Sequence, residues 1–255
     1  LKADSTLGYT LSEAVASASI AFTHTGGSAD AGAPHTCTLR GSALLAGAHT
    51  VPLDADANGC ADSLVLADGA QYTLAFSAAD ASGQASAATQ VTGVVYDSVA
   101  PTASLTLAPY STSLNVALTL GGNDAESGLA AYCVRAVNDA SGCAWAPTAP
   151  AAYAVGADGM HTLYGFVRDA AGNVSAASSA SVDVDTGVPN PPTLTATPLW
   201  VSGSSITIEV NGEPGAFVWV DSANTGIVLD STTGKANVTL NTSAIADGGS
   251  HTFRI

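Results

Sequence analysis

The feature that most constrains this fold is a ten-residue phrase that the chain uses three times. The phrases ADGAQYTLAF, ADGMHTLYGF and ADGGSHTFRI begin at Ala67, Ala157 and Ala246, and their aspartates lie 90 and then 89 residues apart. The polar turns at Asp80 and Asp169 are also separated by 89 residues. Self-similarity at a fixed period indicates that one structural unit is repeated along the chain. The sequence therefore predicts an array of modules of about 90 residues.

Apolar residues inside a repeat alternate with polar ones over lengths typical of β-strands. No segment shows a convincing helical period. Gly, Asn, Asp and Pro separate the alternating stretches, as expected for turns. The clearest strand-like stretches of the second repeat are residues 114–120, 130–137, 161–169 and 180–185. About seven short strands per repeat predict an all-β chain of three tandem immunoglobulin-like β-sandwich modules.

We name the predicted modules by their residues: module 1 is 1–98, module 2 is 99–187 and module 3 is 188–255. The opening LKADSTLGYTLSE aligns with the second strand of module 2, so we expect module 1 to lack its first strand. The closing ADGGSHTFRI ends within the strand before the last one, so we expect module 3 to lack its last strand. A piece of a longer array accounts for both ends, with neighbouring modules of the same chain as partners. The alternative is strand exchange, in which another subunit supplies the missing edge and copies of the chain assemble.

The charge of the chain excludes several classes of partner. Six Lys and Arg stand against 21 Asp and Glu, for a formal net charge of -15. Such a surface repels nucleic acid and anionic membranes. No apolar run approaches the roughly 18 residues of a membrane-spanning helix. A strongly acidic surface attracts cations, and calcium prefers oxygen ligands of this kind.

Four cysteines occur as two local pairs, Cys37 with Cys60 and Cys133 with Cys143. Their spacing matches no zinc framework. We expect two disulfides in an oxidising, extracytoplasmic compartment, and buried free thiols are the alternative.

Several phrases of the chain carry a family resemblance. DGMHTLYGFVRDAAGNVS followed by VDVDTGVPNPPT, and YTLSEAVASASIAFTHTGG followed by VVYDSVAPT, resemble the bacterial Ig-like modules strung in tandem through large surface adhesins and filament proteins. The resemblance covers essentially the whole chain, and it implies a non-catalytic extender segment at the cell surface, frequently stiffened by calcium. Two features depart from the family pattern: Gln84 stands where the turn motif usually has Asn, and the cysteine pairs are additions.

The acidic residues of module 2 are expected to gather at its junction with module 1. In an immunoglobulin-type sandwich, the start of the first strand and two of the loops lie at one pole. The candidate ligands on these segments are Asp97, Asn123, Asp124, Glu126, Asp169 and Asn173. Converging like charges repel, whereas calcium takes six to eight oxygen ligands and turns that repulsion into binding. The alternative is a plain tight turn, in which Asp169 and Asn173 bond their own backbone.

Weaker acidic groups occur elsewhere in the chain. Module 1 has the related pair Glu13 and Asp80, and module 3 has a group near its entry, formed by Asp183, Asp185 and Glu213. The stretch DADANGCAD resembles the front half of an EF-hand calcium loop, with candidate ligands Asp54, Asp56, Asn58 and Asp62. Val65 stands where such a loop ends in Glu, so this is no EF-hand, and a disulfide-pinned turn explains the same residues.

The sequence offers little for catalysis. No GxSxG elbow and no phosphate-binding loop appear, and His24, His35 and His49 lack the spacing of zinc ligands. Exposed tryptophans bind sugars by stacking, so Trp145 and Trp200 are candidates for a rival function, the binding of a carbohydrate or protein ligand. Trp219 lies in the alternating stretch AFVWVD, where core packing is expected.

Overall fold

The structure, a computed structural model, describes residues 1–53, 60, 64–188, 193–194, 203–221 and 223–243. Within these residues the regular elements are β-strands, apart from one short 3-10 helix, η1 (Gly41–Leu44). The predicted all-β fold class is therefore confirmed. The chain divides into two compact units, Leu1–Thr186 and Gly187–Ile255, and each is described by itself. No helix of the described residues is long and apolar enough to cross a membrane.

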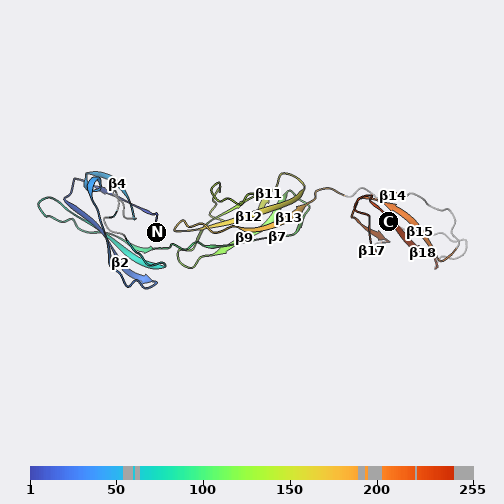
Figure 1. Ribbon diagram of the computed structural model, residues 1–255, viewed down its shortest axis with the longest axis horizontal. Coiled ribbons are helices and arrows are strands. Elements are labelled where there is room, and N and C mark those ends of the chain that lie inside the picture. Colours follow the sequence, from blue (N-terminus) through green and yellow to red (C-terminus); the bar gives the residue numbers. More distant parts are fainter. Residues whose placement is uncertain (54–59, 61–63, 189–192, 195–202, 222, 244–255) are drawn as a thin grey trace. The chain divides into compact units, whose positions relative to one another are not determined.

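The first part of unit 1 contains two antiparallel sheets (Figure 1). One sheet has the strand order β3-β2-β5-β6, and the other pairs β1 with β4. The strands are β1 (Thr6–Leu11), β2 (Ser17–Gly27), β3 (His35–Thr38), β4 (Gly47–Pro52), β5 (Ala70–Ala79) and β6 (Thr89–Val95).

These two sheets share one hydrophobic core. Successive side chains of a strand point to opposite faces, so alternation along β2 buries Ala18, Ile20 and Phe22 together. The same cluster includes Leu11 of β1 and Val51 of β4, which belong to the other sheet. The arrangement is a β-sandwich.

The second part of unit 1 is a further sandwich with its own core. Its sheets have the orders β10-β12-β13-β8 and β11-β9-β7, and only the short pairing of β8 with β13 is parallel among them. Leu163, Val167 and Val182 are fully buried between the sheets, together with Val116. The strands are β7 (Thr102–Leu107), β8 (Tyr110–Ser111), β9 (Asn115–Asn123), β10 (Leu129–Arg135), β11 (Ala152–Ala154), β12 (Gly159–Asp169) and β13 (Ser178–Val184).

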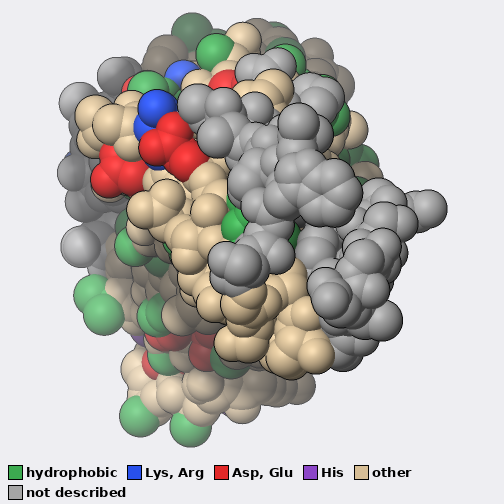
Figure 2. Space-filling view, turned by 90° about the vertical axis from the view of Figure 1, so that its right-hand side faces the viewer, with side chains coloured by type: hydrophobic (Ala, Val, Ile, Leu, Met, Phe, Trp, Pro, Cys, Tyr) green, Lys and Arg blue, Asp and Glu red, His purple; other side chains and the backbone are tan. Residues whose placement is uncertain are grey.

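Unit 2 contains a third hydrophobic cluster, formed around Val210, Val218 and Val238. Its described sheets have the orders β14-β15-β18 and β16-β17. The strands are β14 (Thr193–Leu194), β15 (Ser205–Asn211), β16 (Phe217–Val220), β17 (Ala223–Val228) and β18 (Lys235–Asn241). The face seen in Figure 2 has acidic side chains beside basic ones, and most of its other described surface is neither charged nor hydrophobic. Each of the three clusters lies within one predicted module, while the module boundaries themselves remain predictions.

The repeated turn in the sequence is also a repeated turn in the structure. The main-chain nitrogen of Asp80 donates to the oxygen of Gln84 at 3.0 Å, and that of Asp169 donates to Asn173 at 3.1 Å. After each turn a serine hydroxyl accepts a bond from the preceding strand, Ser86 from Ala78 and Ser175 from Val167. The turns between β5 and β6 and between β12 and β13 are therefore equivalent.

Both expected disulfides are present. Cys37 of β3 is joined to Cys60, and both residues are buried in the first core. Cys133 of β10 is joined to Cys143 in the loop that follows that strand. Each bridge closes a local loop, which restricts the unfolded chain and stabilises the folded one.

A polar network attaches the loop after β2 to strand β5. The hydroxyl of Tyr72 donates to Oδ2 of Asp30 at 2.5 Å, and Nε2 of His35 lies 2.6 Å from the same oxygen. The hydrogen bond from Tyr72, followed by the one with His35, lowers the pKa of Asp30 from 3.8 to about 2. Burial, followed by the bond to Asp30, raises the pKa of Tyr72 to about 12.

This network predicts an acid-sensitive contribution to the stability of the first sandwich. Because the pKa of Asp30 is lower in the folded state, its stabilising effect is complete above the unfolded pKa and is lost as the pH falls from about 4 towards 2. We expect Asp30→Asn to lower the melting temperature at pH 7 and to weaken the decline between pH 4 and pH 2. Scanning calorimetry across this range tests it, with Glu13→Gln at an exposed position as the control. Equal pH profiles for the wild type and Asp30→Asn would contradict this account.

Candidate metal centre

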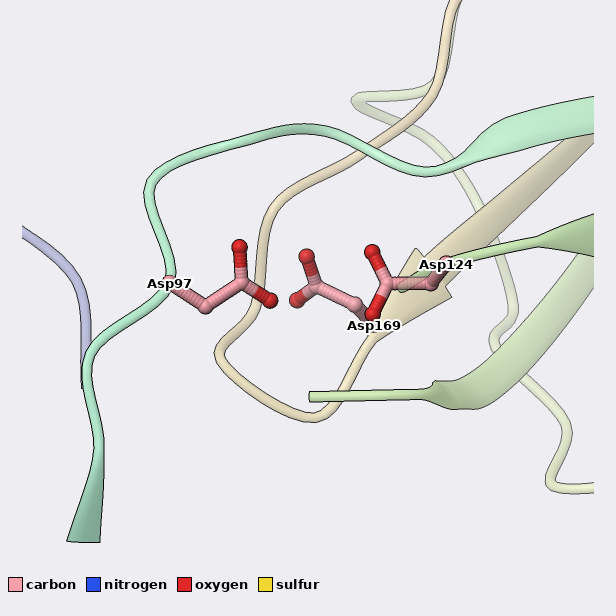
Figure 3. A group of neighbouring side chains, drawn as sticks. All are labelled: Asp97, Asp124 and Asp169. Carbon is pink, nitrogen blue, oxygen red and sulfur yellow. The ribbon is translucent and has the colours of Figure 1, made fainter. Parts of the chain in front are cut away.

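Three carboxylates from three separate segments converge at one point of unit 1 (Figure 3). Asp97 lies in the linker between β6 and β7, Asp124 in the loop between β9 and β10, and Asp169 at the end of β12. One carboxylate oxygen of each residue lies within 4.8 Å of the others. In Figure 3 the side chains of Asp97 and Asp124 point towards each other, and Asp169 lies between them.

The convergence takes place away from solvent. Asp97 is 0% exposed and Asp169 is 1% exposed, while Asp124 is half-buried. Oδ2 of Asp97 is buried and has no hydrogen-bond partner. A buried carboxylate oxygen without a partner is costly, because its water shell has been removed without replacement. A bound cation would supply this oxygen with a partner.

Backbone hydrogen bonds fix the position of Asp97. Its main-chain nitrogen donates to the carbonyl of Leu1 at 2.8 Å, and its Oδ1 accepts from the nitrogen of Val99 at 3.1 Å. The second contact is an Asx turn, which fixes the orientation of the Asp97 carboxylate.

Asp124 is held in a similar way by its own loop. Its Oδ2 accepts hydrogen bonds from the main-chain nitrogens of Ser127 at 3.0 Å and Gly128 at 2.6 Å. These two donors satisfy one oxygen and leave the second available for a ligand role. Aspartates in turns commonly accept hydrogen bonds from the main chain that follows them, so the sequence DAESG contains a signal for these contacts.

Asn173 connects the turn after β12 to the linker. Its side-chain amide donates to Oδ2 of Asp169 at 2.8 Å and to the carbonyl of Asp97 at 3.0 Å. Its main-chain nitrogen donates to Oδ1 of Asp169 at 2.8 Å. Asn173 therefore clamps two of the acidic segments together with its nitrogen atoms. The tight-turn interpretation explains these bonds, but it does not explain why Asp97 and Asp124 meet there.

The equivalent turn of the first sandwich provides a contrast. Asp80 is half-buried, and its Oδ1 accepts bonds from Ser82 and Gln84. The Ser82 hydroxyl and then the Gln84 main chain lower the pKa of Asp80, so its charge is stabilised locally. The same turn motif thus exists once with and once without converging acids.

The three carboxylates have little positive charge around them. In the described part of the chain, no nitrogen of Lys, Arg, His or the amino terminus lies within 4.0 Å of them. The amino group of Leu1 donates instead to the carbonyl of Val95 at 2.7 Å. Its pKa is lowered by burial, although the charges of Asp97 and Asp169 act in the opposite direction. Hard oxygen donors with no protein cation at ion-pair distance fit calcium, which takes main-chain oxygens or waters in addition.

The other predicted ligands of the junction lie outside this group. Asn123 is exposed, and its main-chain oxygen accepts a bond from the hydroxyl of Thr102 at 3.2 Å. Glu126 is half-buried beside Gly69, in the contact between the two sandwiches, and is not among the three converging acids. Candidates Asp54, Asp56, Asn58 and Asp62 lie outside the residues that the structure describes.

Two of the three tryptophans, Trp145 and Trp219, lie in the described part of the chain. The guanidinium of Arg168 lies over the ring of half-buried Trp145, 4.9 Å from its centroid, so one face of this ring is covered. Trp200 is outside the described residues. The expectation that Trp219 packs in the core is wrong, because it is 51% exposed. Val218 of the same strand is buried instead, so the strand turns its opposite face inwards.

Comparisons with known proteins yield low similarity only. No protein-family model and no curated protein matches the sequence. Among solved structures, the chain is similar to fibronectin(III)-like modules of CbhA from Clostridium thermocellum, with a TM-score of 0.36, 15% identity and coverage of 72% of this chain and 87% of that one. It is also similar to the chicken CNTN1 FN1-FN3 domains, with a TM-score of 0.24, 10% identity and coverage of 93% and 81%. Dimeric latent PorU from Porphyromonas gingivalis gives a TM-score of 0.22 at 12% identity, covering 98% of this chain and 29% of that one. Scores this low add nothing to the argument about function.

The converging acids predict an unusual response to Asp97→Asn. Without calcium we expect the variant to be at least as stable as the wild type, because the substitution removes a buried negative charge that has no partner. With calcium we expect only the wild type to gain, by about 2.7 kcal/mol when the ion is at 100 times its dissociation constant. Thermal unfolding in calcium and in chelator measures both effects, and Asp80→Asn should keep the full calcium response. A variant that loses the same stability in chelator as in calcium would identify Asp97 as an ordinary turn residue.

Proposed function

We propose that this chain is a non-catalytic extender segment of an extracellular surface protein, built from tandem immunoglobulin-like sandwiches and stiffened by calcium between modules 1 and 2. The observation that carries the proposal is the buried carboxylate of Asp97, which has an unpartnered Oδ2 and converges with the carboxylates of Asp124 and Asp169. A cation there would replace the repulsion of three acids by attraction.

The placement of the three acids gives such a cation a mechanical role. Asp97 belongs to the linker, whereas Asp124 and Asp169 belong to the second sandwich. An ion held by all three would tie the linker to that sandwich and restrict its backbone. Contacts that already cross the junction support this role, since Asn173 donates to the carbonyl of Asp97 and Lys2 donates to that of Gly172 at 3.3 Å.

The remaining features agree with an extracellular setting. Both disulfides are of a kind that persists in oxidising compartments. The net charge of -15 favours the attraction of divalent cations at the surface. A bacterial adhesin or filament is the parent protein that the sequence resemblance implies, and it forms part of this proposal.

The rival function, binding of a carbohydrate or protein ligand, has less support. Of its two candidate residues, Trp145 has a ring face covered by Arg168, and Trp200 is not described. The spacer function is supported by the acidic centre, because its three carboxylates come from both the linker and the second sandwich.

Stiffening is tested by residual dipolar couplings of modules 1 and 2 in the full chain. In calcium we expect both sandwiches to report one common alignment, and in chelator we expect two different alignments, because the linker regains its freedom. Asp124→Asn in calcium should behave as the wild type does in chelator, whereas Asp80→Asn should behave as the wild type does in calcium. If calcium binds and the two alignments remain different, the ion has no stiffening role. If no response to calcium occurs at all, the metal centre itself is wrong.

A further inference from the structure

The two sandwiches of unit 1 differ at one sheet edge. In the second sandwich β9 lies between β7 and β11, so both of its edges are paired. In the first sandwich β1 pairs with β4 only, and no other described strand lies along its second edge. An unpaired edge presents main-chain donors and acceptors that another strand can use.

Core-facing side chains beside this edge are uncovered. Val91 of β6 lies directly opposite Leu74 of β5, so both point to the same face of the sheet. Leu74 is only 7% exposed, as expected for the core, yet Val91 is 58% exposed. In the second sandwich the equivalent pair is Leu163 with Ala180, which packs against its core. An inward-facing valine is therefore left without the covering that its counterpart has.

A groove runs beside these residues, with a cavity of about 400 Å³. Its lining includes Leu11, Val15, Phe76, Ser86 and Thr89. It lies within the first sandwich, and its walls come from β1, β5 and the turn and strand that follow β5.

Strand β7 fills the equivalent place in the second sandwich. The pair of Phe76 with Thr89 corresponds to that of Gly165 with Ser178. The main-chain nitrogen of Leu105 donates to the hydroxyl of Ser178 at 2.9 Å, and Cβ of Leu105 lies 3.2 Å from where a Cβ of Gly165 would stand. The groove of the first sandwich therefore lies at the position that β7 occupies in the second sandwich.

We infer that this groove receives an extended β-strand with the chemistry of β7 from a separate partner polypeptide. The strand would pair antiparallel with β1, as β7 does with β9, and would place apolar side chains at alternate positions over the exposed core. This interaction goes beyond the spacer function and does not involve calcium.

The lining also specifies one position of the strand. Gly165 leaves room for Leu105 in the second sandwich, whereas the first sandwich has the larger Phe76 at the equivalent position, with its ring 4.9 Å from that of Tyr9. We therefore expect a small residue in the strand at the position equivalent to Leu105.

The probe is a fluorescent peptide based on residues 97–108, whose natural sequence is DSVAPTASLTLA. In the peptide Leu105 is replaced by Ala, to supply the small residue expected at that position. Binding to the full chain is followed by anisotropy in chelator, which removes any effect of calcium. We expect saturable binding with one peptide per chain and a rise in melting temperature. A peptide with Leu107→Asp should bind at least about tenfold more weakly, because it buries a carboxylate, while Thr106→Asp at an exposed position should bind as before.

Matched protein variants locate the site. Val91→Asp and Gln90→Asp change neighbouring exposed residues of β6 that lie on opposite faces, so neither threatens the fold. We expect Val91→Asp to weaken peptide binding at least about tenfold and Gln90→Asp to leave it unchanged. Absent binding, or equal binding by these two variants, would overturn the inference.

Sedimentation of the chain alone identifies a competing occupant. We expect the chain to remain monomeric at the concentrations of the binding assay. A dimer that Val91→Asp abolishes would mean that a second copy fills the groove, which would overturn the proposed occupant.

Discussion

The junction between modules 1 and 2 depends on the electrostatic balance of three carboxylates that separate chain segments bring together. Local hydrogen bonds account for the orientation of each acid, but they leave Oδ2 of Asp97 without a partner in a buried site. Removing a carboxylate from water costs several kcal/mol, and neighbouring like charges increase this cost. A shared proton or a bound cation removes the imbalance, and only the cation also links the segments mechanically. The position of the linker is therefore tied to the chemistry of the site.

The two equivalent turns separate the role of local sequence from that of the surroundings. Both turns have the same main-chain hydrogen bonds, and in both an aspartate carboxylate accepts bonds from the turn itself. In the first sandwich Asp80 is half-buried and is not among the converging acids of the described residues. In the second, the loop after β9 and the incoming linker each add an acid, and Asp169 becomes buried. Convergence of loops, rather than the turn motif, distinguishes the candidate centre.

Sequence reasoning predicted those features that depend on local pattern. The repeat and the alternation of apolar residues predicted four strands of the second sandwich, β9, β10, β12 and β13, within a few residues, and the short cysteine spacing predicted both disulfides. The gathering of acids at one pole followed from the general topology of the sandwich. Features that depend on long-range geometry were not predictable. Which face of β16 is buried depends on a shift of one residue, because alternate side chains point to opposite sides, and Val218 rather than Trp219 is buried. The hydrogen bond from Tyr72 to Asp30 joins residues that are 42 positions apart in the sequence. The exposure of the inward-facing Val91 depends on which strands lie beside β6 in space, and the local sequence does not specify this.

The central claim is that the buried acids form a cation site, and calorimetric titration of metal-stripped protein with calcium tests it most directly. The account predicts a tight binding event that disappears when Asp97, Asp124 and Asp169 are all changed to Asn and that persists unchanged in Asp80→Asn. Magnesium should compete poorly, because it demands a stricter octahedral arrangement than three carboxylates on separate segments provide. Equal calcium binding by the triple variant and the wild type would contradict the account.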